Sequence, residues 1–292
     1  MGRFHRHDDG TWHEHDHDGD DHDHDHDHDH PGHRHDFEDV GDNSGYETGT
    51  ERVDVLEAIY EENDRKADAN RASLDANQVI AVNLMSSPGS GKTTLLRRTL
   101  AELQGELCCG VIEGDIATSL DADRLEGFGA QISLLNTNAG FGGECHLDAP
   151  MVTHALKGLD LTALDLVLIE NVGNLVCPAE FDVGAHHRAM VYSVTEGEDK
   201  PLKYPVMFAA VEVVVVNKTD LLPYLDFDMA LFESNLAKIN PHATIIRTCA
   251  TKGDGVDDWL GWLRAIAAER FTPAGDSSSS SVDSADKALK NV

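Results

Sequence analysis

The chain has 292 residues, of which 40% are hydrophobic, and this is enough for one large domain or two small domains with a substantial core. Its formal net charge of -30 at pH 7 excludes functions that depend on attraction to nucleic acid or to an anionic membrane, because such partners would repel it. The first 50 residues hold 16 acidic and three basic residues, so 37 acidic and 20 basic residues remain elsewhere. We interpret the acidic body as suited to a cytosol of high ionic strength, where salt screens self-repulsion; an ordinary acidic protein is the alternative.

No apolar run follows the first six residues, and no stretch approaches the roughly 18 apolar residues of a membrane helix. The sequence therefore predicts a cytoplasmic protein without membrane insertion. An odd number of cysteines in a reducing compartment favours thiols or metal ligands over disulfides. The five cysteines are Cys108, Cys109, Cys145, Cys177 and Cys249.

Residues 1–50 are low in complexity and hold 12 of the 17 histidines. Because the segment lacks the apolar residues of a core, we expect a disordered tail. Neutral imidazoles at high local concentration bind Ni²⁺, Cu²⁺ or Zn²⁺, which predicts a metal-buffering role; a merely solubilising tail is the alternative. The candidate nickel ligands alternate with aspartate and are His22, His24, His26, His28 and His30.

A helix is predicted from residue 51 to about residue 70, since apolar side chains recur there at helical spacing, at Val53, Leu56, Ile59 and Tyr60. We expect this helix to be amphipathic and to pack on the domain that follows it. That domain is expected to span residues 51–272. The serine-rich residues 273–292 are expected to form a second disordered tail.

A glycine-rich loop follows the first strongly apolar run, Val79–Met85, and precedes a helical pattern. In such a loop, backbone N–H groups turn toward phosphate oxygens and the helix N-terminus adds positive charge. Lys92 is placed to reach the β- and γ-phosphates, and Thr93 to ligate Mg²⁺. The usual pattern has a glycine where this chain has Ser86. The predicted phosphate-binding residues are Gly89, Ser90, Gly91, Lys92, Thr93 and Thr94.

Apolar runs rich in β-branched residues alternate with helical segments through the rest of the domain. Continuous runs of this kind are typical of strands buried on both faces, so we predict an α/β fold with a doubly wound, mostly parallel sheet of the P-loop type. The last helix is predicted at Val256–Phe271. The runs are Cys108–Ile112, Ile132–Leu135, Leu164–Ile169, Met190–Val194 and Val211–Val216.

Two acidic residues follow predicted strands and are candidates for metal binding or catalysis near the nucleotide phosphates. Glu170 lies at the end of a buried strand and is predicted to hold a water molecule of Mg²⁺. The N–H of Gly173 is predicted to donate a hydrogen bond to the γ-phosphate. Asp115 is predicted to act near the metal or the attacking water. The alternative for Asp115 is a helix N-cap. The predicted catalytic residues are therefore Lys92, Asp115 and Glu170.

Guanine specificity is predicted from Asn217-Lys218-Thr219-Asp220, which directly follows the most hydrophobic run. The carboxylate of Asp220 can accept hydrogen bonds from guanine N1–H and its exocyclic amine, a donor pair that adenine lacks. The stem of Lys218 is expected to lie along the base, and Asn217 to tether the loops. Cys249 and Ala250 are candidates for an N–H that contacts guanine O6.

Cys145, His146 and Cys177 are candidate ligands for Ni²⁺ or Zn²⁺, since thiolate and imidazole suit both ions. Cys177 lies four residues after Gly173, so a ligand on this loop would link metal affinity to the nucleotide state, reciprocally. Three ligands leave a site open or require a second copy of the chain. The alternative is that these are ordinary loop or core residues.

The motifs together resemble the hydrogenase nickel-incorporation GTPases, the HypB family, from about residue 53 to about residue 270. The strings that carry the resemblance are Gly89–Thr94, Glu113–Thr118, Cys145–Asp148, Glu170–Pro178, Lys203–Pro205 and Asn217–Asp220. The resemblance implies a slow GTPase of the SIMIBI class that forms a homodimer around nucleotide and metal. It also implies nickel delivery to a [NiFe]-hydrogenase large subunit precursor together with a HypA-type nickel chaperone.

The resemblance further implies that Cys145, His146 and Cys177 are metal ligands at the dimer interface. Some relatives carry a Cys-rich nickel motif at the N-terminus, which this chain lacks because no cysteine precedes Cys108. The histidine tail is a candidate replacement of weaker affinity and higher capacity. The sequence-based prediction is a GTP-hydrolysing nickel chaperone with GTP, Mg²⁺ and Ni²⁺, or Zn²⁺, as its ligands.

Two alternatives stay open. A urease nickel-loading GTPase is expected to carry Cys-Pro-His, whereas here Cys177-Pro178 is followed by Ala179. A nickel-storage protein with a vestigial nucleotide site is the other alternative. The intact Lys92 and Asp220 speak against it.

Overall fold

The computed structural model describes residues 4–6, 12–14, 50–114, 125, 127–135 and 145–269. The chain divides into two units, Met1–Thr48 and Gly49–Val292. In the first unit, β1 (Phe4–Arg6) and β2 (Trp12–Glu14) pair as antiparallel strands. The histidines from His22 to His30 and both predicted tails beyond these strands lie outside the described residues.

The second unit is built on a seven-stranded sheet in the order β5-β4-β6-β3-β7-β8-β9. Every pair of neighbouring strands in it is parallel. The predicted doubly wound α/β fold is therefore confirmed. The strands are β3 (Ile80–Ser86), β4 (Cys109–Glu113), β5 (Gln131–Leu134), β6 (Leu166–Gly173), β7 (His187–Ser193), β8 (Val213–Asn217) and β9 (Thr244–Arg247).

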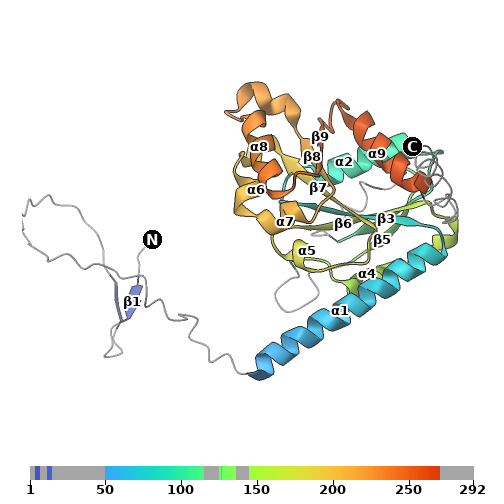
Figure 1. Ribbon diagram of the computed structural model, residues 1–292, viewed down its shortest axis with the longest axis horizontal. Helices are drawn as coiled ribbons and strands as arrows, with labels where there is room; N and C mark the ends of the chain where they lie inside the picture. The colour runs from blue at the N-terminus through green and yellow to red at the C-terminus, as the bar shows by residue number, and fades with distance from the viewer. Residues whose placement is uncertain are drawn as a thin grey trace, which may run out of the picture. The chain divides into compact units, whose positions relative to one another are not determined.

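Helices cover both faces of this sheet (Figure 1). The longer ones are α1 (Thr50–Ala76), α2 (Lys92–Leu103), α4 (Ala149–Leu156), α8 (Met229–Ile239) and α9 (Val256–Glu269). The short ones are α5 (Cys177–Glu180), α6 (Lys200–Lys203) and α7 (Pro205–Ala209), with 3-10 turns at η2 (Leu161–Ala163), η3 (Val194–Glu196) and η4 (Thr219–Tyr224). In the part of the chain that the structure describes, no helix is long and apolar enough to cross a membrane.

Successive side chains of a strand point to opposite faces of the sheet, so each strand contributes to the hydrophobic core under each of the two helix layers. In β8, Val213 and Val215 belong to the core under α2 and α9, whereas Val214 and Val216 belong to the core under α7 and α8. On that second face, α1 and α4 cover the strands on the β4 side of the sheet. All residues of β8 are buried, as a strand covered on both faces requires. The predicted last helix is α9, and its predicted apolar side, Trp259, Leu260, Leu263 and Ile266, is buried.

The predicted apolar face of α1 is wrong where it can be tested. Ile59 and Tyr60 are 50% and 40% exposed, and the side chains of Val53 and Leu56 lie outside the described residues. The buried face consists instead of Asn63, Ala67, Asn70 and Leu74. It is partly polar because α1 covers chain segments whose backbone groups need hydrogen-bond partners.

The carboxyl ends of the parallel strands lie along one edge of the sheet, and the predicted motifs follow these ends. From β3 the chain crosses to β4 on one side, and after β6 it passes to β7 on the other side of β3. The end of β3 is therefore a point where the strand order reverses. Open α/β sheets bind ligands in the crevice outside such a point.

Candidate functional site

The loop after β3 forms a cradle of about 330 Å³, lined by Ser86, Ser87, Gly89, Ser90, Gly91, Lys92, Thr93, Thr94 and Lys218. Gly89 and Gly91 have φ angles of 73° and 95°, a region that favours glycine. A Cβ at Gly91 would also lie 2.5 Å from Nδ2 of Asn217. The loop leads directly into α2, so its N–H groups and the helix N-terminus face the same space.

One buried carboxylate accepts hydrogen bonds from two side chains of this cradle. Glu170 at the end of β6 is fully buried, and its Oε1 accepts from Lys92 Nζ at 2.9 Å and from Thr93 Oγ1 at 2.7 Å. Its Oε2 has no hydrogen-bond partner among the described residues. An acid, a hydroxyl and a lysine thus converge beside the phosphate loop. The carboxylate and the hydroxyl are oxygen ligands of the kind that Mg²⁺ prefers, whereas the Lys92 ammonium is not a metal ligand and suits the phosphates.

The segment after Glu170 lies against the phosphate loop. A Cβ at Gly173 would be 3.1 Å from Cα of Pro88, so only glycine allows this close approach without a shift. The predicted sensor of the γ-phosphate therefore lies at the loop that would hold that phosphate. Asp115, the second predicted acid, lies outside the described residues.

Asn217 tethers the loops around the cradle. Its Nδ2 donates to the carbonyl of Ser90 at 3.0 Å, and its Oδ1 accepts from the N–H of Ala250 at 3.1 Å. Lys218 adopts a left-handed conformation with φ 62°, and its Nζ donates to the carbonyl of Gly89 at 2.5 Å. The two hydrogen bonds of Asn217 provide the tethering expected of it. We define Gly89–Thr94 together with Glu170, Asn217 and Lys218 as the nucleotide cradle.

Asp220 lies in η4, one turn beyond the cradle. Its carboxylate is 3.3 Å from Nζ of Lys252, a partner that the motif alone does not indicate. Hydrogen bonds from the Cys249 side chain and from Lys252 lower the pKa of Asp220, so the group is an anionic acceptor. The N–H of Ala250 donates to Asn217, and that of Cys249 to the carbonyl of Asp254. A contact from either N–H to guanine O6 stays a prediction.

Cys145, His146 and Cys177 meet at one point, although 32 residues separate the two cysteines. Their ligand atoms all lie within 4.8 Å of one another. Cys145 Sγ is 2.9 Å from Cys177 Sγ and 3.5 Å from Nδ1 of His146. We call these three residues the thiol cluster. Two sulfurs and an imidazole nitrogen at these separations suit a thiophilic ion such as Ni²⁺ or Zn²⁺.

An aromatic stack borders the thiol cluster. The ring of Phe181 stacks on His146 with a centroid distance of 4.1 Å, and Tyr60 of α1 stacks on Phe181 at 5.3 Å. Asn174 Nδ2 also donates to Cys177 Sγ at 3.5 Å. Sequence reasoning did not find Phe181 or Asn174 as neighbours of the cluster, because no periodicity marks contacts between separate loops.

Two asparagines of α1 brace the segments that carry the cluster. Asn63 Oδ1 accepts from the N–H of Ala149 at 2.9 Å, and its Nδ2 donates to the carbonyl of Asp182 at 3.0 Å. Asn70 Nδ2 donates to the carbonyls of Ala149 and Val183 at 3.0 Å and 3.1 Å. Their seven-residue spacing on one helix face, around the small Ala67, is the only signal that could have indicated this role.

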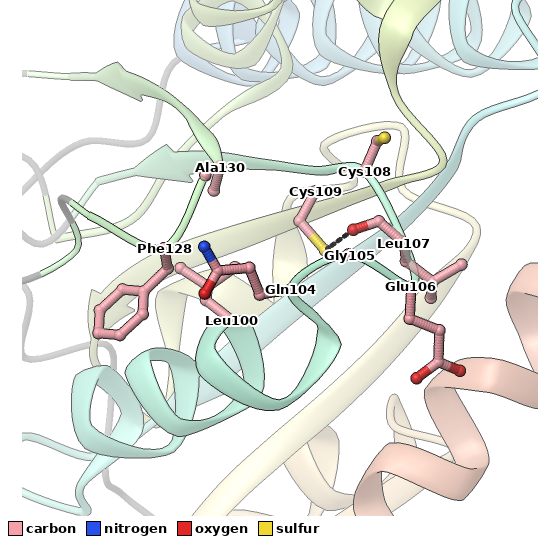
Figure 2. A pocket seen from close by; sticks show the side chains of 10 residues that line it. Leu100, Gln104, Gly105, Glu106, Leu107, Cys108, Cys109, Phe128 and Ala130 are labelled. Carbon is pink, nitrogen blue, oxygen red and sulfur yellow. Dashed lines mark hydrogen bonds between the residues drawn. The ribbon is translucent and has the colours of Figure 1, made fainter.

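The other cysteines have different surroundings, and none of the five, all of which lie in described segments, forms a disulfide. Cys109 lines a separate cavity of about 180 Å³, where its thiol donates to the carbonyl of Leu107 at 3.6 Å (Figure 2). Burial raises the pKa of Cys109 to about 12, which keeps the thiol protonated. A protonated thiol is a poor ligand, so Cys109 does not resemble the cysteines of the thiol cluster.

The glycine loop between a buried strand and a helix, with Lys92 and Thr93 facing Glu170, defines a P-loop nucleotide-binding protein of the doubly wound α/β class. The family model described as "CobW/HypB/UreG, nucleotide-binding domain" matches residues 80–247. The hydrogenase maturation factor HypB of Escherichia coli K12 is 50% identical over 211 residues, which are 72% of this chain and 70% of that protein.

Other relatives agree. A probable hydrogenase maturation factor HypB of Methanocaldococcus jannaschii is 39% identical over 217 residues, covering 74% of this chain and 96% of that protein. The crystal structure of HypB from Archaeoglobus fulgidus superposes with a TM-score of 0.66 at 39% identity, over 71% of this chain and 99% of that one. HypB from Helicobacter pylori in complex with nickel superposes with a TM-score of 0.66 at 34% identity, over 73% and 98%. The chain belongs to the HypB family of hydrogenase maturation factors.

Proposed function

We propose that this chain is a Mg²⁺-dependent GTPase that carries nickel and helps to insert it into [NiFe]-hydrogenase during maturation. The strongest support is that two sites lie close together in the sequence. One is on β6, and the other is on the segment that directly follows β6. Glu170 in this strand accepts from Lys92 and Thr93, and Cys177, seven residues later, belongs to the thiol cluster. Relatives named as hydrogenase maturation factors, one of them in complex with nickel, support the metal and the pathway.

In this proposal the phosphate loop binds the triphosphate through the backbone N–H groups of Gly89–Thr94, and Lys92 compensates the charge of the β- and γ-phosphates. Thr93 and Glu170 hold Mg²⁺, which neutralises charge that develops on the phosphates. Gly173 detects the γ-phosphate through its N–H group. Asp115 acts as a second acid near the metal or the attacking water.

In the same proposal Asp220 selects guanine by accepting from N1–H and the exocyclic amine. Its carboxylate is already oriented by Lys252, so little reorganisation is needed when the base arrives. The stem of Lys218 lies along the base, and Asn217 keeps the base loop attached to the phosphate loop. Cys249 or Ala250 contributes the N–H near O6.

Nickel is the cargo, and the thiol cluster is its exchange site. Cys145 is exposed and the other two ligands are partly exposed, so an incoming ion or a partner's ligand can reach them. Three ligands leave a position open, which favours transfer over storage. In a homodimer the second copy brings its own three ligands to the site.

In this proposal the histidine-rich residues 1–50 act as a nickel buffer ahead of the GTPase domain at residues 51–272, which the serine-rich residues 273–292 follow. The partners in this proposal are a second copy of the chain, a HypA-type nickel chaperone and the hydrogenase large subunit precursor, in the cytoplasm.

Hydrolysis assays with GTP and ATP, followed by nickel transfer to hydrogenase precursor, test the proposal. We expect GTP hydrolysis that needs Mg²⁺, little ATP hydrolysis, and transfer that fails in the Cys177→Ala variant. Equal hydrolysis of ATP and GTP would contradict the base assignment. Transfer that is unaffected by Cys177→Ala would contradict the cargo site.

A further inference from the structure

Asn171 is a fully buried carboxamide that lies directly after Glu170 on β6. Its Oδ1 accepts from the N–H of Leu147 at 3.0 Å and from the N–H of Val172 at 2.9 Å. Its Nδ2 donates to Oδ1 of Asn83 on β3 at 3.2 Å. One side chain thus joins the strand of the buried acid, the strand before the phosphate loop, and the segment that carries two ligands of the thiol cluster.

Leu147 is the point at which that ligand segment is anchored. It follows His146 directly, and its side chain is fully buried over Gly114, where a Cβ would lie 2.5 Å from Leu147 Cδ1. The N–H of Gly114 donates to the carbonyl of Glu170 at 2.9 Å. The backbone and the side chain of Leu147 are therefore both held near the end of β6.

We propose that Asn171 is a positioning residue that transmits the state of the nucleotide site to Cys145 and His146. This role rests on the proposed function. It adds a second connection between the nucleotide site and the thiol cluster, besides the one that runs along the chain to Cys177. Cys177 follows Gly173 on the chain, so a shift of this segment moves one thiol. A shift at Glu170 moves the Asn171 side chain and, through Leu147, the other two ligands.

The chemistry of the amide explains why this position requires asparagine. It must accept from the backbone N–H groups of Leu147 and Val172 and donate to a carboxamide oxygen at the same time, in a fully buried place. Asn171→Ala removes both functions and leaves buried polar groups unpaired. Asn171→Asp keeps the oxygen that accepts from Leu147 and, when protonated, can still donate to Asn83.

Asn63 offers a matched control. It also holds the segment after the thiol cluster, by accepting from the N–H of Ala149 at 2.9 Å. Its other partner is the carbonyl of Asp182, and it lies on α1 rather than next to Glu170. Asn63→Ala should therefore weaken nickel binding similarly in every nucleotide state, whereas Asn171→Ala should change the difference between states.

The test uses the full chain and the thiolate-to-nickel charge-transfer absorption. This signal reports the thiol cluster alone among the two nickel-binding regions, because no cysteine precedes Cys108. Nickel is set by a metal buffer, and apparent affinity is measured with GDP and with a non-hydrolysable GTP analogue, each with Mg²⁺. In the wild-type protein we expect the two affinities to differ by about 5- to 150-fold, as in coupled sites.

Asn171→Ala should reduce this ratio to near one while the chain still binds the GTP analogue, and Asn171→Asp should restore most of it. If Asn171→Ala does not fold, Asn83→Ala removes only the acceptor that orients the amide. That variant should lower the ratio by about fivefold, the equivalent of one lost buried hydrogen bond.

A wild-type ratio of one would overturn the role of Asn171, because there would be no coupling to transmit; the proposed function would instead be contradicted by absent GTP hydrolysis or by nickel transfer that does not need Cys177. A wild-type ratio above about five that persists in Asn171→Ala, or in Asn83→Ala where that variant is needed, would overturn the role of Asn171 alone. Loss of the ratio in Asn63→Ala to the same extent would also overturn it, since the effect would then be general loosening of the cluster.

Discussion

The nucleotide cradle and the thiol cluster lie on segments joined by β6, yet their surroundings differ. In the cradle, Lys92, Glu170 and Asn217 are buried, and each has hydrogen-bond partners within the protein. In the cluster, Cys145 is exposed, and the three ligands come from two separate segments, one before α4 and the other at the start of α5. The side chains of the cradle are held by contacts with the protein itself, whereas the ligands of the cluster are partly exposed to solvent.

This difference indicates that the cradle is suited to tight and selective binding, and that the cluster is suited to exchange of a metal ion. A preorganised cradle binds tightly and selects its ligand, since few groups must be ordered or desolvated on binding. An open cluster can gain and lose an ion or a fourth ligand. Variants that damage one region and spare the other therefore test whether the two regions differ in this way.

The largest effect is expected at the buried pair of Lys92 and Glu170, whose side chains are 4% and 0% exposed. Lys92→Met should abolish GTP hydrolysis and lower the free energy of unfolding by about 3–5 kcal/mol, because it leaves the carboxylate buried without its cation. Adding Glu170→Leu should recover most of that stability but no hydrolysis. Urea unfolding and phosphate release measure the two effects; full stability of Lys92→Met would show that the pair does not hold the cradle.

Deletion of residues 1–40 separates the two proposed nickel-binding regions. We expect most bound nickel to be lost and GTP hydrolysis to be unchanged, because most histidines precede the GTPase domain. Binding by the tail should fade as the pH falls below about 6.5, where free imidazoles become protonated. Equilibrium dialysis of the full and shortened chains measures this. An unchanged nickel count in the shortened chain would refute the buffer.

A smaller effect is expected at the base end of the cradle. Asp220→Asn should weaken GTP binding by roughly 30-fold, because a charge-assisted hydrogen bond is lost and an amide faces the donors of guanine. The hydrogen bonds from Cys249 and Lys252 that lower the pKa of Asp220 keep it ionised as the pH falls toward about 4. The preference for GTP over ATP should therefore persist in mildly acidic buffer. Calorimetric titration at two pH values tests both statements.

The smallest effect is expected at Cys108, which is exposed and lies apart from the thiol cluster. Cys108→Ser should leave nickel affinity, its dependence on nucleotide and the stability of the protein essentially unchanged. This variant serves as the control for cysteine substitutions in general. A clear loss of nickel affinity in Cys108→Ser would mean that the ligand set has been assigned wrongly.

The features that sequence predicted correctly are local. Continuous runs such as Val213–Val216 require burial on both sides, and the spacing within Gly89–Thr94 specifies a loop between a strand and a helix. The partners of Cys177 could be proposed, but their meeting depends on a fold that brings together residues 32 apart. Phe181 and Lys252 were missed for the same reason.

The error at α1 has a similar physical origin. Apolar spacing favoured a face that includes Ile59 and Tyr60, both of which are substantially exposed. The face that is buried carries Asn63 and Asn70, because it must satisfy backbone groups of Ala149, Asp182 and Val183. Hydrophobic periodicity does not detect a helix face chosen for hydrogen bonding.

We expect the nucleotide state to control nickel binding by the thiol cluster. The most direct measurement is a nickel titration of the chain lacking residues 1–40, in GTP-analogue and GDP states, with molar mass followed by light scattering. We predict affinities that differ by about 5- to 150-fold, a dimer favoured by the GTP analogue with Mg²⁺, and loss of the affinity difference in Cys177→Ala with guanine binding retained. Identical nickel affinities in both states and a constant monomer mass would contradict the claim.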